Sequence, residues 1–277
     1  MSNFAVLDHT VINVRFEMDK AERCFRELGF FLTERGYHSL GSINHLMMFG
    51  TDYIELIALP PENKDNPGRQ DIAKAPYGIN GLVFKTDDVD ETFAHLLSIG
   101  MAGDPPKAFT RPVTTKDGTF DASFRTVHTR SGIFPGGRVY FCEHGTPELV
   151  WRPEWQSHEN GAEAMPEFVV VSHEPNIEAE NFAKLLNVDI KKIAKTHCIN
   201  YENGFIRVMS EADYRTRYGS LASPMNERKS IFGAIVIRAS SLDNVRSILD
   251  AEMTTIVEED RVVIRVDAFD SLLEFIA

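Results

Sequence analysis

The chain has 277 residues, 43% of them hydrophobic and 10% aromatic, which is enough for one large or two medium globular domains with a proper core. The 41 acidic and 29 basic residues give a net charge of −12, which disfavours nucleic acid or an anionic membrane as a partner, because both would repel the protein. A small molecule or another protein is the expected partner. Only three cysteines, no signal-like amino-terminal pattern and no membrane-length apolar run lead us to expect a cytoplasmic protein.

The first sixty residues predict a strand, a helix and three more strands. Residues 5–14 are β-branched and apolar, and residues 21–28 place apolar side chains on one helical face before Gly29. Glycine-containing turns then separate three short apolar runs, at 30–34, 43–49 and 53–59. We therefore predict a β-α-β-β-β module.

The same pattern resumes after residues 60–76, which are rich in Pro, Asn, Asp and Lys and predict a linker. A strand is expected at 79–86 and a helix at 88–99. The stretch 105–119 is expected to be a long irregular loop. Later strands are predicted at 124–129, 138–142 and 149–151.

Two further modules follow the polar segment around residues 155–165. The third is predicted to have a strand at 168–172, a helix at 177–186 and strands at 197–201 and 205–209. The fourth is predicted to have strands at 231–239, 255–258, 261–266 and 272–276 and a helix at 242–249. We predict an α+β protein of two domains: 1–155, with modules 5–60 and 77–152, and 156–277, with modules 166–220 and 230–277.

A single carboxylate recurs inside the apolar run that ends three of these segments. The residues are Glu55, Glu148 and Glu274. An unpaired charge is costly to bury, so each of these is a metal ligand, a relic of one, or a side chain that faces a solvated cavity.

The motifs Leu-Asp-His9-Thr-Val, Tyr-Ile-Glu55-Leu and His144-Gly-Thr-Pro-Glu148-Leu carry a family resemblance. Through these motifs the chain resembles the vicinal oxygen chelate superfamily and, within that superfamily, the glyoxalase-like domain proteins. The resemblance implies that each pair of modules forms a curled mixed β-sheet cup, with helices outside and a divalent metal or small ligand inside. The superfamily includes lyases, isomerases, dioxygenases and metal-free sequestering proteins, so the fold alone names no reaction.

The resemblance also implies a ligand set. The first-strand ligand falls on His9, and the last-strand carboxylates fall on Glu55 and Glu148. The remaining position, usually a histidine, lies near Gly81 with Asn80 beside it. Three hypotheses remain open: fewer protein ligands, His144 in the vacant position, or no metal.

One imidazole and two carboxylates suit Fe, Mn, Ni or Zn. The alternative role for His9 is that of a core histidine, and for His144 that of a structural or hydrogen-bonding residue. Candidate substrate-binding residues are Asn44, His45, Asn80 and Arg125.

The second pair of modules departs further from the pattern and is expected to be structural. Glu274 remains, but Arg207 stands where a carboxylate is expected. Our leading hypothesis is a divalent-metal-dependent enzyme acting on a small oxygen-rich or 2-oxo substrate in the first cup, with Glu55 and Glu148 as catalytic carboxylates. The alternative is a metal-free small-molecule binding protein. A homodimer is possible under either hypothesis.

Overall fold

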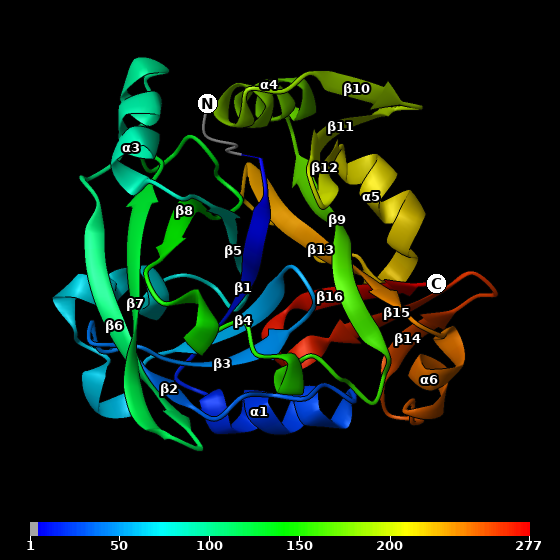
Figure 1. Ribbon diagram of the computed structural model, residues 1–277. Helices are drawn as coiled ribbons and strands as arrows, with labels where there is room; N and C mark the ends of the chain where they lie inside the picture. Colours follow the sequence, from blue (N-terminus) through cyan, green and yellow to red (C-terminus); the bar gives the residue numbers. More distant parts are fainter. Residues whose placement is uncertain (1–4) are drawn as a thin grey trace.

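The computed structural model describes residues 5–277, which form two eight-stranded mixed sheets (Figure 1). In the first sheet, β1 pairs in parallel with β4 and antiparallel with β5, and β5 pairs in parallel with β8. The strand order is β2-β3-β4-β1-β5-β8-β7-β6. Its strands are β1 Leu7–Arg15, β2 Gly36–Tyr37, β3 Ile43–Met48, β4 Tyr53–Ala58, β5 Gly78–Lys85, β6 Lys107–Thr115, β7 Gly118–His128 and β8 Arg138–His144.

The second sheet repeats this topology. Its order, β10-β11-β12-β9-β13-β16-β15-β14, is that of the first sheet with each number raised by eight. The α+β class and the duplicated modules predicted from the sequence are therefore confirmed. The strands are β9 Ala162–Ser172, β10 Ile190–Ile193, β11 Thr196–Tyr201, β12 Gly204–Met209, β13 Ser230–Ala239, β14 Thr254–Val257, β15 Arg261–Val266 and β16 Ser271–Ile276.

Four helices, α1, α3, α4 and α6, lie within a few residues of their predicted bounds, while α2 and α5 were not predicted. Helix α1 buries Met18, Ala21 and Phe25 on one face, and the chain leaves it through Gly29, whose positive φ of 74° suits glycine. Helix α3 begins at the Asp88 cap, which accepts hydrogen bonds from two backbone amides. The helices are α1 Met18–Glu27, α2 Gln70–Ala73, α3 Val89–Ser98, α4 Pro175–Leu186, α5 Glu211–Tyr218 and α6 Leu242–Ser247, with 3-10 turns at Pro61–Asn63, Pro67–Arg69, Pro147–Leu149, Pro153–Trp155, Gly219–Leu221 and Asp267–Phe269.

A common hydrophobic core joins the two halves. The ring centroids of Phe134 and Phe182 are 4.3 Å apart, and those of Phe30 and Phe275 are 6.0 Å apart. All strands of the first sheet precede residue 155 and all strands of the second sheet follow it. The domain boundaries 1–155 and 156–277 stay a prediction. Within residues 5–277, no helix combines the length and apolarity needed to cross a membrane.

Four local predictions were wrong. The expected loop at 105–119 belongs to the hairpin of β6 and β7, whose polar, mostly exposed residues hide the apolar alternation of a strand. The expected strand at 149–151 is replaced by the turn Pro147–Leu149, because Pro147 favours the first position of a helical turn. The run at 30–34 forms no strand, and the linker carries short helices.

Candidate active site

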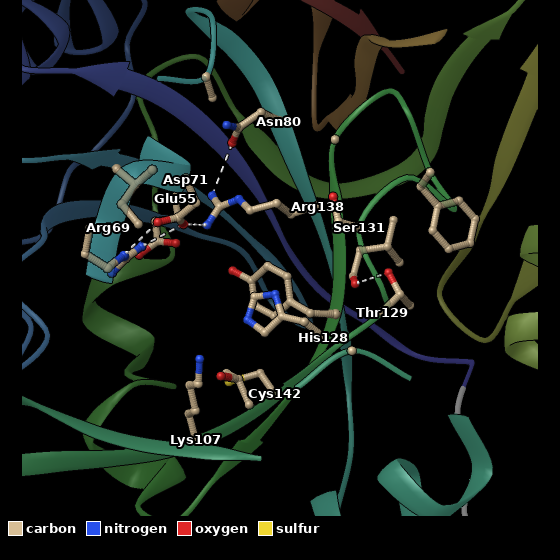
Figure 2. Close-up of a pocket in the computed structure, with 18 of the residues that line it drawn as sticks. Glu55, Arg69, Asp71, Asn80, Lys107, His128, Thr129, Ser131, Arg138 and Cys142 are labelled. Atoms are coloured by element: carbon tan, nitrogen blue, oxygen red, sulfur yellow. Dashed lines mark hydrogen bonds and ion pairs between the residues drawn. The ribbon is translucent and has the colours of Figure 1, made fainter. Parts of the chain in front are cut away.

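The first sheet curls around a cavity of about 1080 Å³ (Figure 2). Strands β1, β3, β4, β5, β6, β7 and β8 supply the inner wall, and the linker and the loop between β7 and β8 supply much of the rim. Arg228, from the second half of the chain, also lines it. Aromatic side chains contribute apolar surface; they include Tyr77, Phe109, Phe124, Phe134 and Tyr140.

His9 and Glu55 meet in this cavity. The parallel pairing of β1 and β4 places His9 opposite Tyr53, and Glu55 lies two residues further along the same strand, so both side chains project from one face. The imidazole Nε2 is 3.8 Å from the Glu55 Oε2. Both residues are buried, with exposed fractions of 4% and 6%. Two of the predicted site residues are therefore brought together.

Glu55 is held in its ionised form. Burial acts to raise its pKa, but the attraction of His9 and His38 and a 2.7 Å hydrogen bond from the Asn44 amide outweigh burial and lower the pKa below its ordinary value. His38 Nε2 is 4.0 Å from the other Glu55 oxygen. Burial lowers the pKa of His38 to about 4, so this second imidazole is neutral at pH 7.

Asp8 orients His9. Its Oδ2 is 2.6 Å from His9 Nδ1 and 3.1 Å from His144 Nε2, and it also accepts a hydrogen bond from the Tyr53 hydroxyl. These contacts lower the pKa of the fully buried Asp8 despite the opposing effect of burial. Because Nδ1 is directed at Asp8, Nε2 is the ring nitrogen that faces Glu55 and the Tyr140 hydroxyl, which is 3.4 Å from Nε2.

The role of Asp8 was missed because strand alternation predicts that adjacent residues point to opposite faces. A register shift between Leu7 and His9 in the pairing of β1 with β5 breaks that alternation. The sequence signal was the Asp-His pair itself. The side chain of His38, which belongs to none of the motifs named above, also lines the cavity.

Glu148 does not occupy the predicted position. It is exposed on the turn Pro147–Leu149 and does not line the cavity. Its expected placement on a last strand facing the cup is wrong, because that strand is β8, which ends at His144. Tyr140 is the β8 side chain that reaches His9.

Among residues 5–277, one set of potential metal ligands has all its donor atoms within 4.8 Å of one another: Asp8, Cys142 and His144. The predicted set that includes Glu148 does not converge. His144 contacts Asp8 instead of extending toward Glu55, so it belongs to the hydrogen-bond network behind His9.

Two of the predicted substrate-binding residues line the cavity and two do not. Asn44 holds Glu55, and Asn80 accepts a hydrogen bond from Arg138. His45 faces away from the cavity, with Nδ1 2.7 Å from the Thr33 carbonyl oxygen and Nε2 near Glu22.

Arg125 is exposed and forms an ion pair with Asp90. Both lie next to cavity-lining residues on strands, His45 beside Asn44 and Arg125 beside Phe124, and adjacent residues of a strand face opposite sides of the sheet.

The equivalent place in the second half is filled by ion pairs. By strand pairing, Arg207 of β12 is the equivalent of Glu55 of β4. Glu167 of β9 is likewise the equivalent of His9 of β1. Arg217 of α5 pairs with both Glu167 and Glu274, and the Tyr218 hydroxyl donates to Glu274 at 2.6 Å. Arginines therefore neutralise the carboxylates here, and a structural role for this half stays a prediction.

The duplicated β-α-β-β-β modules and the curled sheet around a polar centre define a protein of the vicinal oxygen chelate superfamily. The model of the glyoxalase-like domain family matches residues 7–186, and the chain belongs to that family. No curated protein matches the sequence.

Three solved structures share the fold. A hypothetical protein from Staphylococcus aureus is 14% identical with a TM-score of 0.65, and the match covers 97% of this chain and 98% of the other. A mutant 4-hydroxymandelate synthase from Streptomyces coelicolor is 12% identical with a TM-score of 0.59, covering 100% and 93%. A fusion of a xylose isomerase-like TIM barrel with 4-hydroxyphenylpyruvate dioxygenase is 11% identical with a TM-score of 0.61, covering 99% of this chain and 49% of the fusion. At these identities the similarity concerns the fold alone.

Proposed function

We propose that the cup of the first half is the active site of a divalent-metal-dependent enzyme that acts on a small oxygen-rich or 2-oxo substrate. Lyase, isomerase or dioxygenase chemistry fits such a site. The observation that carries the proposal is the approach of His9 Nε2 to Glu55 Oε2, at 3.8 Å, inside a large cavity.

The residues present fit a divalent cation. His9 offers its Nε2, because its Nδ1 is hydrogen-bonded to Asp8, which is the usual arrangement behind a metal-ligating histidine. Glu55 offers an ionised carboxylate. An imidazole and a carboxylate suit Fe, Mn, Ni or Zn, and a cation with two protein ligands keeps positions open for substrate oxygens.

A bound cation would polarise the substrate carbonyl and acidify the neighbouring C–H bond. Glu55 is ionised and accepts a proton at a carboxylate oxygen. Tyr140 stays protonated, because burial raises the pKa of its hydroxyl, and its O–H is available to donate to a substrate oxygen. Aromatic side chains give part of the cavity wall an apolar surface against which the substrate can pack.

The metal-free hypothesis has two observations in its favour. Glu148 lies outside the cavity, and Asn80 stands beside the position near Gly81 where the resemblance implies a further ligand. Under this hypothesis the same cavity binds a small molecule without transforming it.

Elemental analysis of protein purified without chelator separates the two functions. We expect near-stoichiometric metal in the wild type and loss of metal in His9→Ala and Glu55→Gln. Glu148→Gln is the matched control, since the exposed Glu148 is expected to leave the metal content unchanged. A wild type that holds no metal, even after reconstitution with Fe(II), Mn(II), Ni(II) and Zn(II), contradicts the enzyme proposal and supports the binding protein.

A further inference from the structure

The charges that line the cavity differ in sign from the protein as a whole. The chain carries a net charge of −12, but five cationic and three anionic side chains line the cavity. A cavity with apolar walls concentrates the field of such charges and favours anionic ligands. The cations are Arg69, Lys107, Arg130, Arg138 and Arg228, and the anions are Glu55, Asp71 and Asp104.

Two of these arginines share one carboxylate. Asp71 Oδ1 is 3.2 Å from Arg69 Nε, and Asp71 Oδ2 is 2.7 Å from Arg138 Nη1 (Figure 2). Arg138 also donates from Nη2 to Asn80 Oδ1 at 3.2 Å, while its buried Nε has no hydrogen-bond partner. The group of Arg69, Asp71 and Arg138 therefore has one positive charge in excess. We name this group the arginine pair site.

The excess charge lies close to the proposed reaction centre. Arg138 and Tyr140 are two residues apart on β8 and project from the same face, and the Tyr140 hydroxyl is 3.4 Å from His9 Nε2. His128 stacks on Tyr140 at 4.3 Å. Burial and the nearby Arg138 lower the pKa of His128 to about 3, so His128 adds no charge at pH 7.

We infer that the arginine pair site binds the carboxylate of the substrate, and that the ligand of this cup is an organic monoanion with an apolar remainder. The planar guanidinium groups match a carboxylate through paired N–H donors. A single excess charge matches a monoanion. Phe109 and Phe124, stacked at 5.1 Å on the cavity wall, supply apolar surface for the rest of the molecule. The inference rests on the proposed function only in taking this cup as the substrate site.

A purely structural role is the competing explanation, in which the ion pairs only fasten the linker to β8. The two explanations predict opposite changes in anion affinity when the Asp71 carboxylate is removed. Removing the charge of Asp71 weakens a structural ion-pair cluster, but it leaves two arginines free for an anion. Asp71→Asn is therefore expected to tighten anion binding by about tenfold, the gain of one charge-assisted contact.

The test is calorimetric titration of the purified protein with phenylacetate and with neutral phenylacetamide, at millimolar concentration. We expect phenylacetate to bind and phenylacetamide to bind at least about tenfold more weakly. Arg138→Met should weaken phenylacetate binding by a similar factor, Arg138→Lys by less, and Arg69→Met should weaken it independently. Arg125→Met, which alters an exposed arginine outside the cavity, should bind as the wild type does.

Equal binding of the acid and the amide, no binding of either, or an Asp71→Asn variant that binds phenylacetate more weakly than the wild type would overturn the inference. Thermal unfolding of each variant checks that it folds. If Arg138→Met does not fold, Arg69→Met tests the inference in its place. Binding is measured without turnover or added metal. A protein that binds phenylacetate but holds no metal would therefore contradict the proposed enzyme function and leave the present inference intact.

Discussion

Asp8 and His9 are neighbours in the chain and in the site: the Asp8 Oδ2 is 2.6 Å from the His9 Nδ1, although both side chains belong to one strand. This contact, made possible by the register shift at the start of β1, sets which nitrogen of His9 faces Glu55.

Asp8→Asn should weaken metal binding without removing either proposed ligand. The amide keeps the size of the side chain but does not hold the Nδ1 proton as a carboxylate does, and loss of such a partner typically costs about 10- to 100-fold in affinity. Competitive metal titration gives the affinity, and the ring ¹⁵N shifts of His9 report the tautomer. Unchanged affinity together with an unchanged tautomer would show that Asp8 is only structural.

The stability of the protein should fall as the pH drops from about 6.5 toward 4. His38 and His128 have folded-state pKa values of about 4 and about 3, below the unfolded value of 6.5. Between these values the unfolded state binds more protons, so each histidine lowers the free energy of unfolding by up to about 1.4 kcal/mol per pH unit as the pH falls.

Denaturant unfolding of His128→Gln over this range should show a smaller slope with pH than the wild type. His173→Gln is the control, because His173 is half exposed. A His128→Gln slope identical to that of the wild type contradicts the prediction.

Arg217→Met should destabilise the protein by about 1–3 kcal/mol, because it removes the cation shared by buried Glu167 and Glu274, which keep Arg207 and Arg261 as partners. Arg215→Met removes a neighbouring exposed arginine of α5 and should cost less than about 1 kcal/mol. Chemical denaturation measures both. Metal content should not change in either variant, since α5 lies in the second half; a loss of metal on Arg217→Met would show that the halves are coupled.

Gly81→Ala should destabilise the sheet by about 1–3 kcal/mol, the usual range for overpacking. A β-carbon at Gly81 would lie 2.7 Å from the β-carbon of Val11 on the adjacent strand. Gly50→Ala is the control, since nothing lies within 4 Å of its added carbon. Equal unfolding temperatures for the two variants would mean that β1 and β5 do not approach so closely.

Sequence patterns predicted most of the sheet because buried strands have apolar side chains whatever lies around them. Strands β1, β4, β5, β13 and β16 are almost fully buried, and all fall within predicted strands to within a residue or so at their ends. Strand β6 and the first half of β7 were missed because the hairpin that they form is largely exposed, so its few apolar residues do not stand out from the polar ones.

Some features of the candidate site could be predicted from the sequence, and others depended on the tertiary structure. The sequence by itself determined the duplicated modules, the family and the presence of His9 and Glu55 on inner strands, since these depend on local pattern and on motif. Only the tertiary structure decided that Glu148 lies outside the cavity, that Asp8 turns inward beside His9, and that Arg69 and Arg138 meet at Asp71. Each of these depends on strand register or on segments far apart in the chain coming together, and neither is encoded in the spacing of neighbouring residues.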